Sequence, residues 1–428
     1  MRKKKNAFTL IELLAVIVIL AVILVISIPR ILDAIDVSKK DSFKNAAQLI
    51  ADSAEKKKVS DKLLGKDESI TCKDVAKISD DYGTCKITFD DSGVATVVIN
   101  GKKGGKFDNL ACQGTKDNMT CAEGEISTAR KCTSSSSSKF VDGQYTYTYS
   151  SYDKGWSVAL TDKSSTNPVT TELCGTINDK PIVSMQYMFQ YSKATSIDVS
   201  SFDTSKVTYM LGMFYKSAAT EIKGLENFDT SNVTDMYSMF QYSKATSIDV
   251  SSFDTSNVTD MSYMFDSSAA TEIKGLENFD TSNVTDMSSM FASTKVTSLD
   301  LSGFDTSKVT DMSSMFAGIK VTSLDLSGFD TSKVTDMHGM FYNSAATSLD
   351  LSSFDTSKVT DMHGMFFNNE KILTLDVSSF DTSNVTNMSD MFLWCKATTG
   401  YARSQKDADR FNASSNKPAG LTFVVKSQ

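Results

Sequence analysis

Histidine is almost absent from this chain of 428 residues, which contains two, along with only four prolines and two tryptophans. With so few imidazoles, histidine-dependent catalysis and histidine-rich metal sites are weak hypotheses from the start. No proline falls between Pro181 and Pro418, which is consistent with uninterrupted backbone ladders there. The net charge of −8 disfavours nucleic acid as the main partner, because phosphates need a basic face. The length predicts several domains or a repeat array, and nothing in the composition predicts a cofactor.

The chain opens on a basic segment that is followed by a long apolar run. Residues 2–5 are all basic, and residues 8–28 are apolar except for Thr9, Glu12 and Ser27. As an α-helix this run rises about 31 Å, enough to cross a bilayer. A plain membrane anchor is one interpretation, and a cleaved secretory signal is another, although no small-x-small cleavage site follows the run. Glu12 suits neither, because a carboxylate within an apolar helix is costly and usually has a partner.

The sequence of residues 5–14, KNAFTLIELL, resembles the leader junction of type IV pilins. The resemblance implies cleavage between Ala7 and Phe8, methylation of the new N-terminus at Phe8, and pairing of Glu12 with the terminal amine of a neighbouring subunit. Pro29 matches the helix-kinking proline of that family, whereas Ala7 departs from its usual glycine. The implied partners are other pilin subunits and a prepilin peptidase. The implied location is the cytoplasmic membrane before assembly, then the cell surface or a pilus.

Beyond the apolar run, helical spacing continues as far as Gly65, so we expect a leader over residues 1–7 and one helix over residues 8–65. Residues 66–133 then show strand and turn patterns and contain five of the seven cysteines. They predict a small β head with disulfides, because so short a domain has little core of its own. Zinc is disfavoured, since no C-x-x-C motif and no nearby histidine occur. The candidate disulfide cysteines are Cys72, Cys85, Cys112, Cys121, Cys132 and Cys174, and Cys72–Cys85, which closes a short loop, is the pair that we expect first.

A run of five serines at residues 134–138 predicts a flexible linker and the boundary between domains. After it, Tyr145, Tyr147 and Tyr149 alternate strictly with threonine, and a turn leads to a second strand at Trp156. Such an aromatic row could bind sugar. The interpretation we favour is a hairpin over residues 139–181 that covers the open end of a neighbouring core.

Repeats fill the second half of the chain. Phe-Asp-Thr-Ser recurs eight times from Phe202 to Phe380 at intervals of 25 or 26 residues, and Met-Phe recurs nine times from Met188 to Met391. A fixed short period is typical of a solenoid. Eighteen of the twenty methionines lie in these units, which indicates core filling rather than metal binding.

In one unit, Leu299 and Leu301 alternate as in a strand with both leucines inward. Met312 and Met315 change to helical spacing, which predicts a short helical turn on the opposite wall with Asp311 as its N-cap.

The motif F-D-T-S-x-V-T-x-M-x-x-M-F resembles BspA-like leucine-rich repeats of bacterial surface proteins. We therefore expect a multi-domain α+β chain: a long pilin helix, a small β head, and a leucine-rich-repeat solenoid of about nine coils over residues 182–399. Each coil would hold one strand and one helical turn, and residues 400–428 would form a C-terminal cap. The resemblance implies surface display and adhesion, without catalytic residues.

The function that these features predict is a surface-displayed, pilin-like adhesin or recognition subunit, as a minor or tip pilin, for an unknown host, matrix or cell-surface ligand. The alternative is a pseudopilin of a type II secretion or DNA-uptake machine, with the solenoid as a spacer. An enzyme, for example a carbohydrate-cleaving solenoid, is disfavoured because the exceptions to the repeat lie near its ends.

The outward strand column suggests a ligand face. Aspartate alternates there with Lys223 and Lys274 in the first coils and then forms an unbroken row. The row consists of Asp300, Asp325, Asp350 and Asp376. Like charges on strands about 4.8 Å apart repel each other, although water and salt can compensate. The sharper hypothesis is that the row binds calcium or a cationic partner.

His338 and His363 occupy equivalent places in successive coils. They predict either two exposed turn residues, which we favour, or a shared metal site or pH sensor.

Overall fold

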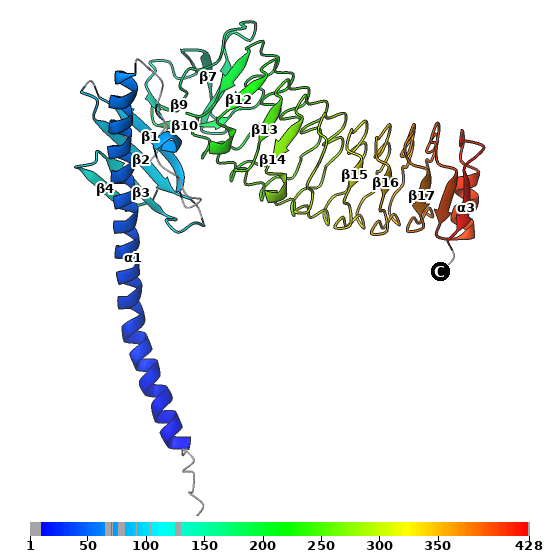
Figure 1. Ribbon diagram of the computed structural model, residues 1–428, viewed down its shortest axis with the longest axis horizontal. Coiled ribbons are helices and arrows are strands. Elements are labelled where there is room, and N and C mark those ends of the chain that lie inside the picture. Colours follow the sequence, from blue (N-terminus) through cyan, green and yellow to red (C-terminus); the bar gives the residue numbers. More distant parts are fainter. Residues whose placement is uncertain are drawn as a thin grey trace, which may run out of the picture. The chain divides into compact units, whose positions relative to one another are not determined.

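The computed structural model describes the backbone of residues 10–64, 70, 72–75, 82–90, 92–102, 104–124 and 130–426, with side chains from residue 36 onward except at 73 and 84. The chain divides into two compact units, Met1–Thr128 and Ala129–Gln428 (Figure 1).

The first unit packs a long helix, α1 (Leu10–Leu63), on an antiparallel sheet of order β1-β2-β3-β4. Phe43, Ala47 and Ile50 recur at helical spacing on α1 and are buried against Val97 and Ile99 of the sheet. The other elements are α2 (Cys72–Val75), β1 (Tyr82–Phe89), β2 (Ala95–Gly101), β3 (Leu110–Gly114) and β4 (Met119–Glu123).

Two disulfides fasten this unit, one between Cys72 of α2 and Cys85 of β1 and one between Cys112 of β3 and Cys121 of β4. The first pair is the one that the sequence led us to expect, and it is confirmed, but the second pair is the more local of the two, with a separation of 9 residues against 13. Within the described part of the chain, no helix is both long and apolar enough to span a membrane. The side chains of the apolar run 8–28 lie outside that part.

The second unit begins with a six-stranded sheet of order β5-β9-β10-β8-β7-β6. Its strands are β5 (Arg130–Cys132), β6 (Lys139–Asp142), β7 (Tyr145–Ser150), β8 (Gly155–Leu160), β9 (Cys174–Ile177) and β10 (Lys180–Ser184). Tyr145, Tyr147 and Trp156 are buried, and the Tyr145 ring meets the ring of Phe202 at 5.9 Å between centroids. The aromatic row therefore faces the solenoid core and not solvent.

The boundary between the units precedes β5, so the serine run at residues 134–138 lies inside the second unit. The N–H of Ser134 donates to Oδ1 of Asn178 at 3.0 Å, and Nδ2 of Asn178 donates to the Ser134 carbonyl at 2.8 Å. These bonds hold the start of the run against the turn between β9 and β10.

A parallel β-solenoid of about 11 turns follows. Short strands stack in one column, in register from coil to coil, for example Ile197 opposite Ile222. The strands and short helices are β11 (Ser196–Asp198), β12 (Glu221–Lys223), η1 (Leu225–Asn227, 3-10), β13 (Ser247–Asp249), β14 (Glu272–Lys274), η2 (Leu276–Asn278, 3-10), β15 (Ser323–Leu324), β16 (Ser348–Leu349), β17 (Thr374–Val377), β18 (Thr399–Ala402), α3 (Gln405–Asn412) and β19 (Thr422–Val425).

Methionine and phenylalanine from every coil fill the solenoid core, as the repeat predicts. The rings form a ladder, in which Phe240 and Phe265 lie 5.7 Å apart and nearly parallel. Where a coil has 26 residues, Gly224 adopts φ 91° and leads into η1. A side chain there would meet the backbone of Ser200 at 2.3 Å, so this position requires glycine.

The predicted fold class, multi-domain α+β with about nine coils of strand plus helical turn, is wrong, because the chain is mostly β. The wall opposite the strands is a column of parallel bridges, such as Asp311 to Asp336, each followed by tight turns. The N–H of Met312 donates to the Asp336 carbonyl of the next coil at 3.1 Å, and Ser314 adopts φ 55°. A residue with positive φ interrupts a helix, so the spacing of three and four comes from successive turns.

The expected number of about nine coils is lower than the observed number of about 11 turns, because the first and last turns of the solenoid lack the repeat motif. Val169 pairs with Ile197 ahead of the first motif, and β19 pairs with β18 after the last one. Segments expected to cap the solenoid thus continue its strand column.

Candidate binding surfaces of the solenoid

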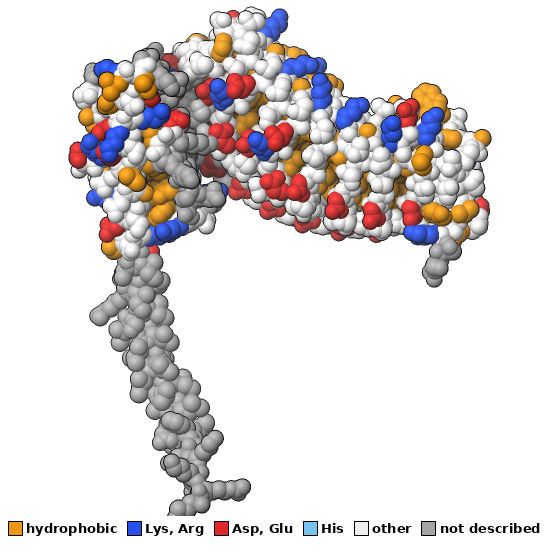
Figure 2. All heavy atoms as spheres, viewed as in Figure 1, with side chains coloured by type: hydrophobic (Ala, Val, Ile, Leu, Met, Phe, Trp, Pro, Cys, Tyr) orange, Lys and Arg blue, Asp and Glu red, His pale blue; other side chains and the backbone are white. Residues whose placement is uncertain are grey.

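On the visible face of the solenoid, charged side chains of one sign gather along each long edge, while acidic and basic side chains lie side by side between the edges at the first coils. Figure 2 shows Lys and Arg gathered along one long edge and Asp and Glu along the opposite edge. The strand register agrees with the expected alternation, because Asp198 lies opposite Lys223 and Asp249 opposite Lys274.

The carboxylates of the acidic row accept hydrogen bonds from serines two residues further along the same turn. Oδ1 of Asp325 accepts hydrogen bonds from the hydroxyl of Ser327 at 2.7 Å and from its N–H at 3.1 Å. These bonds hold the pKa of Asp325 below its ordinary value, despite the neighbouring carboxylates. Asp300 and Asp350 are bonded to serine in the same way. The fourth carboxylate, that of Asp376, accepts from the Ser378 N–H and pairs with the ammonium of Lys426. Each carboxylate of the row thus has a partner within the chain.

A shallow hollow of about 270 Å³ lies at the C-terminal end of this row, lined by Asp350, Asp376 and several serines. Among the described residues, however, the acidic row brings no three metal-ligand atoms together. Calcium binding there stays a prediction without geometric support.

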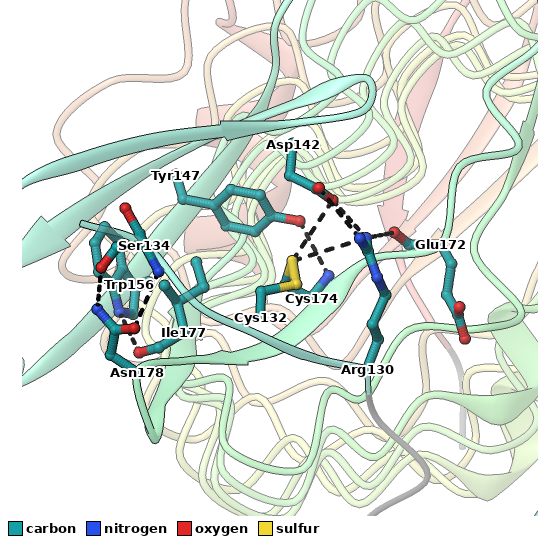
Figure 3. Close-up of a disulfide and its surroundings, with 10 residues drawn as sticks. All are labelled: Arg130, Cys132, Ser134, Asp142, Tyr147, Trp156, Glu172, Cys174, Ile177 and Asn178. Atoms are coloured by element: carbon teal, nitrogen blue, oxygen red, sulfur yellow. Dashed lines mark hydrogen bonds and ion pairs between the residues drawn. A yellow bond between two sulfur atoms is a disulfide. The ribbon is translucent and has the colours of Figure 1, made fainter. Parts of the chain in front are cut away.

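The three ligand-type side chains that do converge in the described part of the chain are Cys132, Asp142 and Cys174. The two cysteines form a disulfide, and Asp142 pairs with the guanidinium of Arg130 (Figure 3). Disulfide sulfurs are not thiolates, so this set does not fit a metal. The hydroxyl of Tyr147 accepts from the Cys174 N–H at 3.0 Å, and burial raises the pKa of Tyr147 to about 12. The disulfide joins β5 to β9, and the ion pair joins β5 to β6. The cluster therefore stabilises the cap, the six-stranded sheet that precedes the solenoid.

The two histidines do not share a ligand. Nδ1 of His338 lies 2.8 Å from Oδ1 of Asp336, whereas Nδ1 of His363 lies 2.8 Å from Oγ of Ser389. The His338 ring is thus bonded within its own turn, whereas the His363 ring is bonded to the coil that follows.

The processing residues Ala7 and Phe8 lie outside the described residues. Glu12 and Pro29 fall within the bounds of α1, but their side chains are also outside the described part.

Sequence reasoning missed a surface that we call the turn edge, the first four residues after each Met-Phe pair. Trp394 there is 62% exposed, and Tyr191 is 54% exposed. The available signal was the repeat column itself, in which aromatic residues and lysines recur at fixed places after Met-Phe.

Four overlapping stretches of the chain, residues 165–274, 212–327, 268–374 and 319–415, match the family described as "Mycoplasma protein of unknown function, DUF285". Together they span more than half of the chain. The chain belongs to the DUF285 family. The β-solenoid is thus built of DUF285 repeats, whereas the identity with BspA-like leucine-rich repeats stays a prediction.

Residues 2–28 match the prokaryotic N-terminal methylation motif, which confirms the predicted prepilin leader of this DUF285 chain. No curated protein and no solved structure matches the chain.

Proposed function

We propose that this DUF285 chain is a surface-displayed, pilin-like adhesin or recognition subunit, a minor or tip pilin whose solenoid binds a ligand outside the cell. The proposal depends on one observation: a prepilin methylation motif at residues 2–28 precedes a β-solenoid in the same chain. A prepilin leader suggests insertion into the membrane and then display on the surface or a pilus.

The solenoid supports the recognition role. Stacked coils present an extended surface, which suits an extended ligand more than a small substrate. The resemblance of the repeats to BspA-like surface proteins points the same way. Other pilin subunits and a prepilin peptidase are the partners proposed for the N-terminal segment.

Immunogold labelling of intact cells with antibodies to the solenoid, together with N-terminal sequencing of surface-extracted protein, tests this function. We expect a mature chain that begins at Phe8 and label at the cell surface or at filament tips. A chain that begins at Met1 or after Ile28 would contradict the processing. Label confined to short stubs within the envelope would favour the pseudopilin alternative.

Replacing Glu12 tests assembly separately from cleavage. We expect Glu12→Gln to leave cleavage intact but to reduce incorporation into filaments, because a neutral side chain cannot pair with the terminal amine of a neighbour. Glu12→Asp keeps the carboxylate and is the matched control. Normal incorporation of Glu12→Gln would remove the charge-pairing argument.

A further inference from the structure

The turn edge carries two files of aromatic rings. Near the start of the solenoid, Tyr215 lies 5.5 Å from Tyr191 and 6.1 Å from Tyr242, measured between ring centroids. Near its end, Phe367 stacks on Tyr342 at 4.5 Å and meets Trp394 at 5.0 Å. Consecutive coils supply these rings, so each file runs along the solenoid axis.

The fold does not require these rings. The second residue after every Met-Phe pair has positive φ, including 58° at Tyr191, 57° at Tyr242 and 62° at Trp394. Serine, glycine or asparagine takes the same place in five other coils. A left-handed backbone is unfavourable for a bulky side chain and natural for glycine or asparagine. Three of the six rings, those of Tyr191, Tyr242 and Trp394, are thus kept at strained positions and are exposed to solvent. Such rings indicate a contact outside the chain.

A column of lysines runs beside the rings. All six are exposed, and none of them forms an ion pair with a described residue. Five of them, Lys193, Lys244, Lys295, Lys320 and Lys396, are the fourth residue after Met-Phe, and the sixth, Lys371, is the fifth residue because Glu370 precedes it. In the remaining coils alanine takes this place, as at Ala218 and Ala345. The turn edge also contains Asp266 and Glu370, but its lysines outnumber these two acids, so it is locally basic on a chain whose net charge is −8.

We propose that the turn edge binds a linear anionic polysaccharide along the solenoid axis; this inference rests on the proposed function, in which the solenoid is the recognition part. The apolar C–H face of a sugar ring packs on the electron-rich face of an aromatic ring. Successive coils are about 4.8 Å apart, which is close to the length of one sugar ring along a chain. Lysines recur every one or two coils, so they match one carboxylate or sulfate for each one or two sugars.

Nucleic acid fits the turn edge less well. A strand of DNA carries one phosphate about every 3.4 Å, a denser charge than lysines spaced by one or two coils can match. The column also contains no arginine, the residue suited to bidentate phosphate contacts.

A cationic ligand is disfavoured too, because a lysine of the chain itself already lies against the aromatic rings near the start of the solenoid. Nζ of Lys216 lies 5.1 Å from the ring centroids of Tyr215 and Tyr242.

The test measures binding of the full-length chain in mild detergent to hyaluronan and polygalacturonate, with dextran as the neutral polymer and oligo-dT as the nucleic acid. A ring variant combines Tyr342→Ala with Trp394→Asn, and a lysine variant combines Lys295→Ala with Lys320→Ala. Each new residue already occupies that place in another coil, so folding should survive, as circular dichroism would show. The control variant combines Asp325→Asn with Asp350→Asn on the strand column.

We expect at least one acidic polysaccharide to bind, and the ring variant to weaken that binding by roughly tenfold. The lysine variant should weaken binding similarly and flatten its dependence on salt. The control should bind acidic polysaccharide no more weakly than the original chain.

Failure of both acidic polymers to bind, unchanged binding by folded ring and lysine variants, or equal binding of dextran would overturn the proposal. Tighter binding of oligo-dT that both variants weaken would reassign the edge to single-stranded nucleic acid. Normal surface labelling together with any of these results would leave the proposed function standing. Polysaccharide binding by a chain that never reaches the surface would overturn the proposed function alone.

Discussion

At the residue scale, buried threonines form hydrogen bonds that join each coil to the next. The hydroxyl of Thr306 donates to the Asp330 carbonyl at 2.9 Å and accepts from the Asp330 N–H at 2.8 Å. We predict that Thr306→Val lowers the free energy of unfolding by about 1–3 kcal/mol, because it leaves two backbone groups without this partner. Thr306→Ser keeps the hydroxyl and should cost about 1 kcal/mol or less. Urea unfolding of the full-length chain measures both, and equal losses would contradict the hydrogen-bond argument.

Asp381 joins the last repeats to the C-terminal turn and makes stability depend on pH. Hydrogen bonds from Ser383 and from the guanidinium of Arg403 lower the pKa of Asp381 from 3.8 to about 2. Because its pKa is lower in the folded chain, the carboxylate stabilises the fold above pH 3.8, and this contribution is lost as the pH falls toward 2. We predict that Asp381→Asn lowers the melting temperature at pH 7. Melting curves of the two proteins should converge near pH 2, and a difference independent of pH would point to packing instead.

A fixed period let the sequence predict which residues share a column. The opposition of Asp198 and Lys223 and the burial of Met312 both follow from counting residues from one motif to the next. The period does not predict backbone dihedrals, because Tyr191, Gly318 and Asn368 all adopt positive φ at one place while their propensities differ. The period places the rings of the turn edge in shared columns, but it does not say whether those columns face the core or solvent.

At the scale of elements, local spacing was misleading where a backbone group bonds to the next coil. Met312 and Met315 have helical spacing, yet the N–H of Phe316 donates to the Met340 carbonyl at 3.0 Å, in the coil that follows. Partners 24 or 25 residues away leave no trace in a short window, so a helical turn and a solenoid turn look alike. The serine run was predicted to be a flexible linker for the same reason. Its first residue, Ser134, is hydrogen-bonded to Asn178, which lies far along the chain.

The Cys132–Cys174 disulfide joins β5 to β9 and closes a segment with a sequence separation of 42 residues. We predict that replacing both cysteines by serine destabilises the cap by about 4 kcal/mol in the chain-entropy model. Fluorescence of the buried Trp156 reports on the cap, because its Nε1 donates to the Ile177 carbonyl at 3.2 Å. In a Trp394→Phe background, the denaturation midpoint of this signal should fall well below that of the disulfide-bonded chain. An unchanged midpoint would mean that the sheet alone holds β5.

At the scale of the whole molecule, the solenoid should tolerate a change in length by whole coils. Residues 188–205 are identical to residues 239–256, and residues 217–236 are identical to residues 268–287. Deleting residues 217–267 therefore joins Lys216 to a segment with the sequence that it already precedes. We predict a folded chain whose solenoid is two coils, or about 10 Å, shorter in electron micrographs, because each repeat contacts only its neighbours.

A deletion that breaks the period supplies the control. Removing residues 217–254 joins Lys216 to Thr255 and connects the turn wall of one coil to the middle of another, so the strand column loses its register. That change would expose the methionine and phenylalanine core, and we expect aggregation or loss of the cooperative thermal transition. If both deletions fold equally well, the coils are not held by register. If neither folds, stability depends on particular coils, and the nearest-neighbour description of this solenoid is wrong.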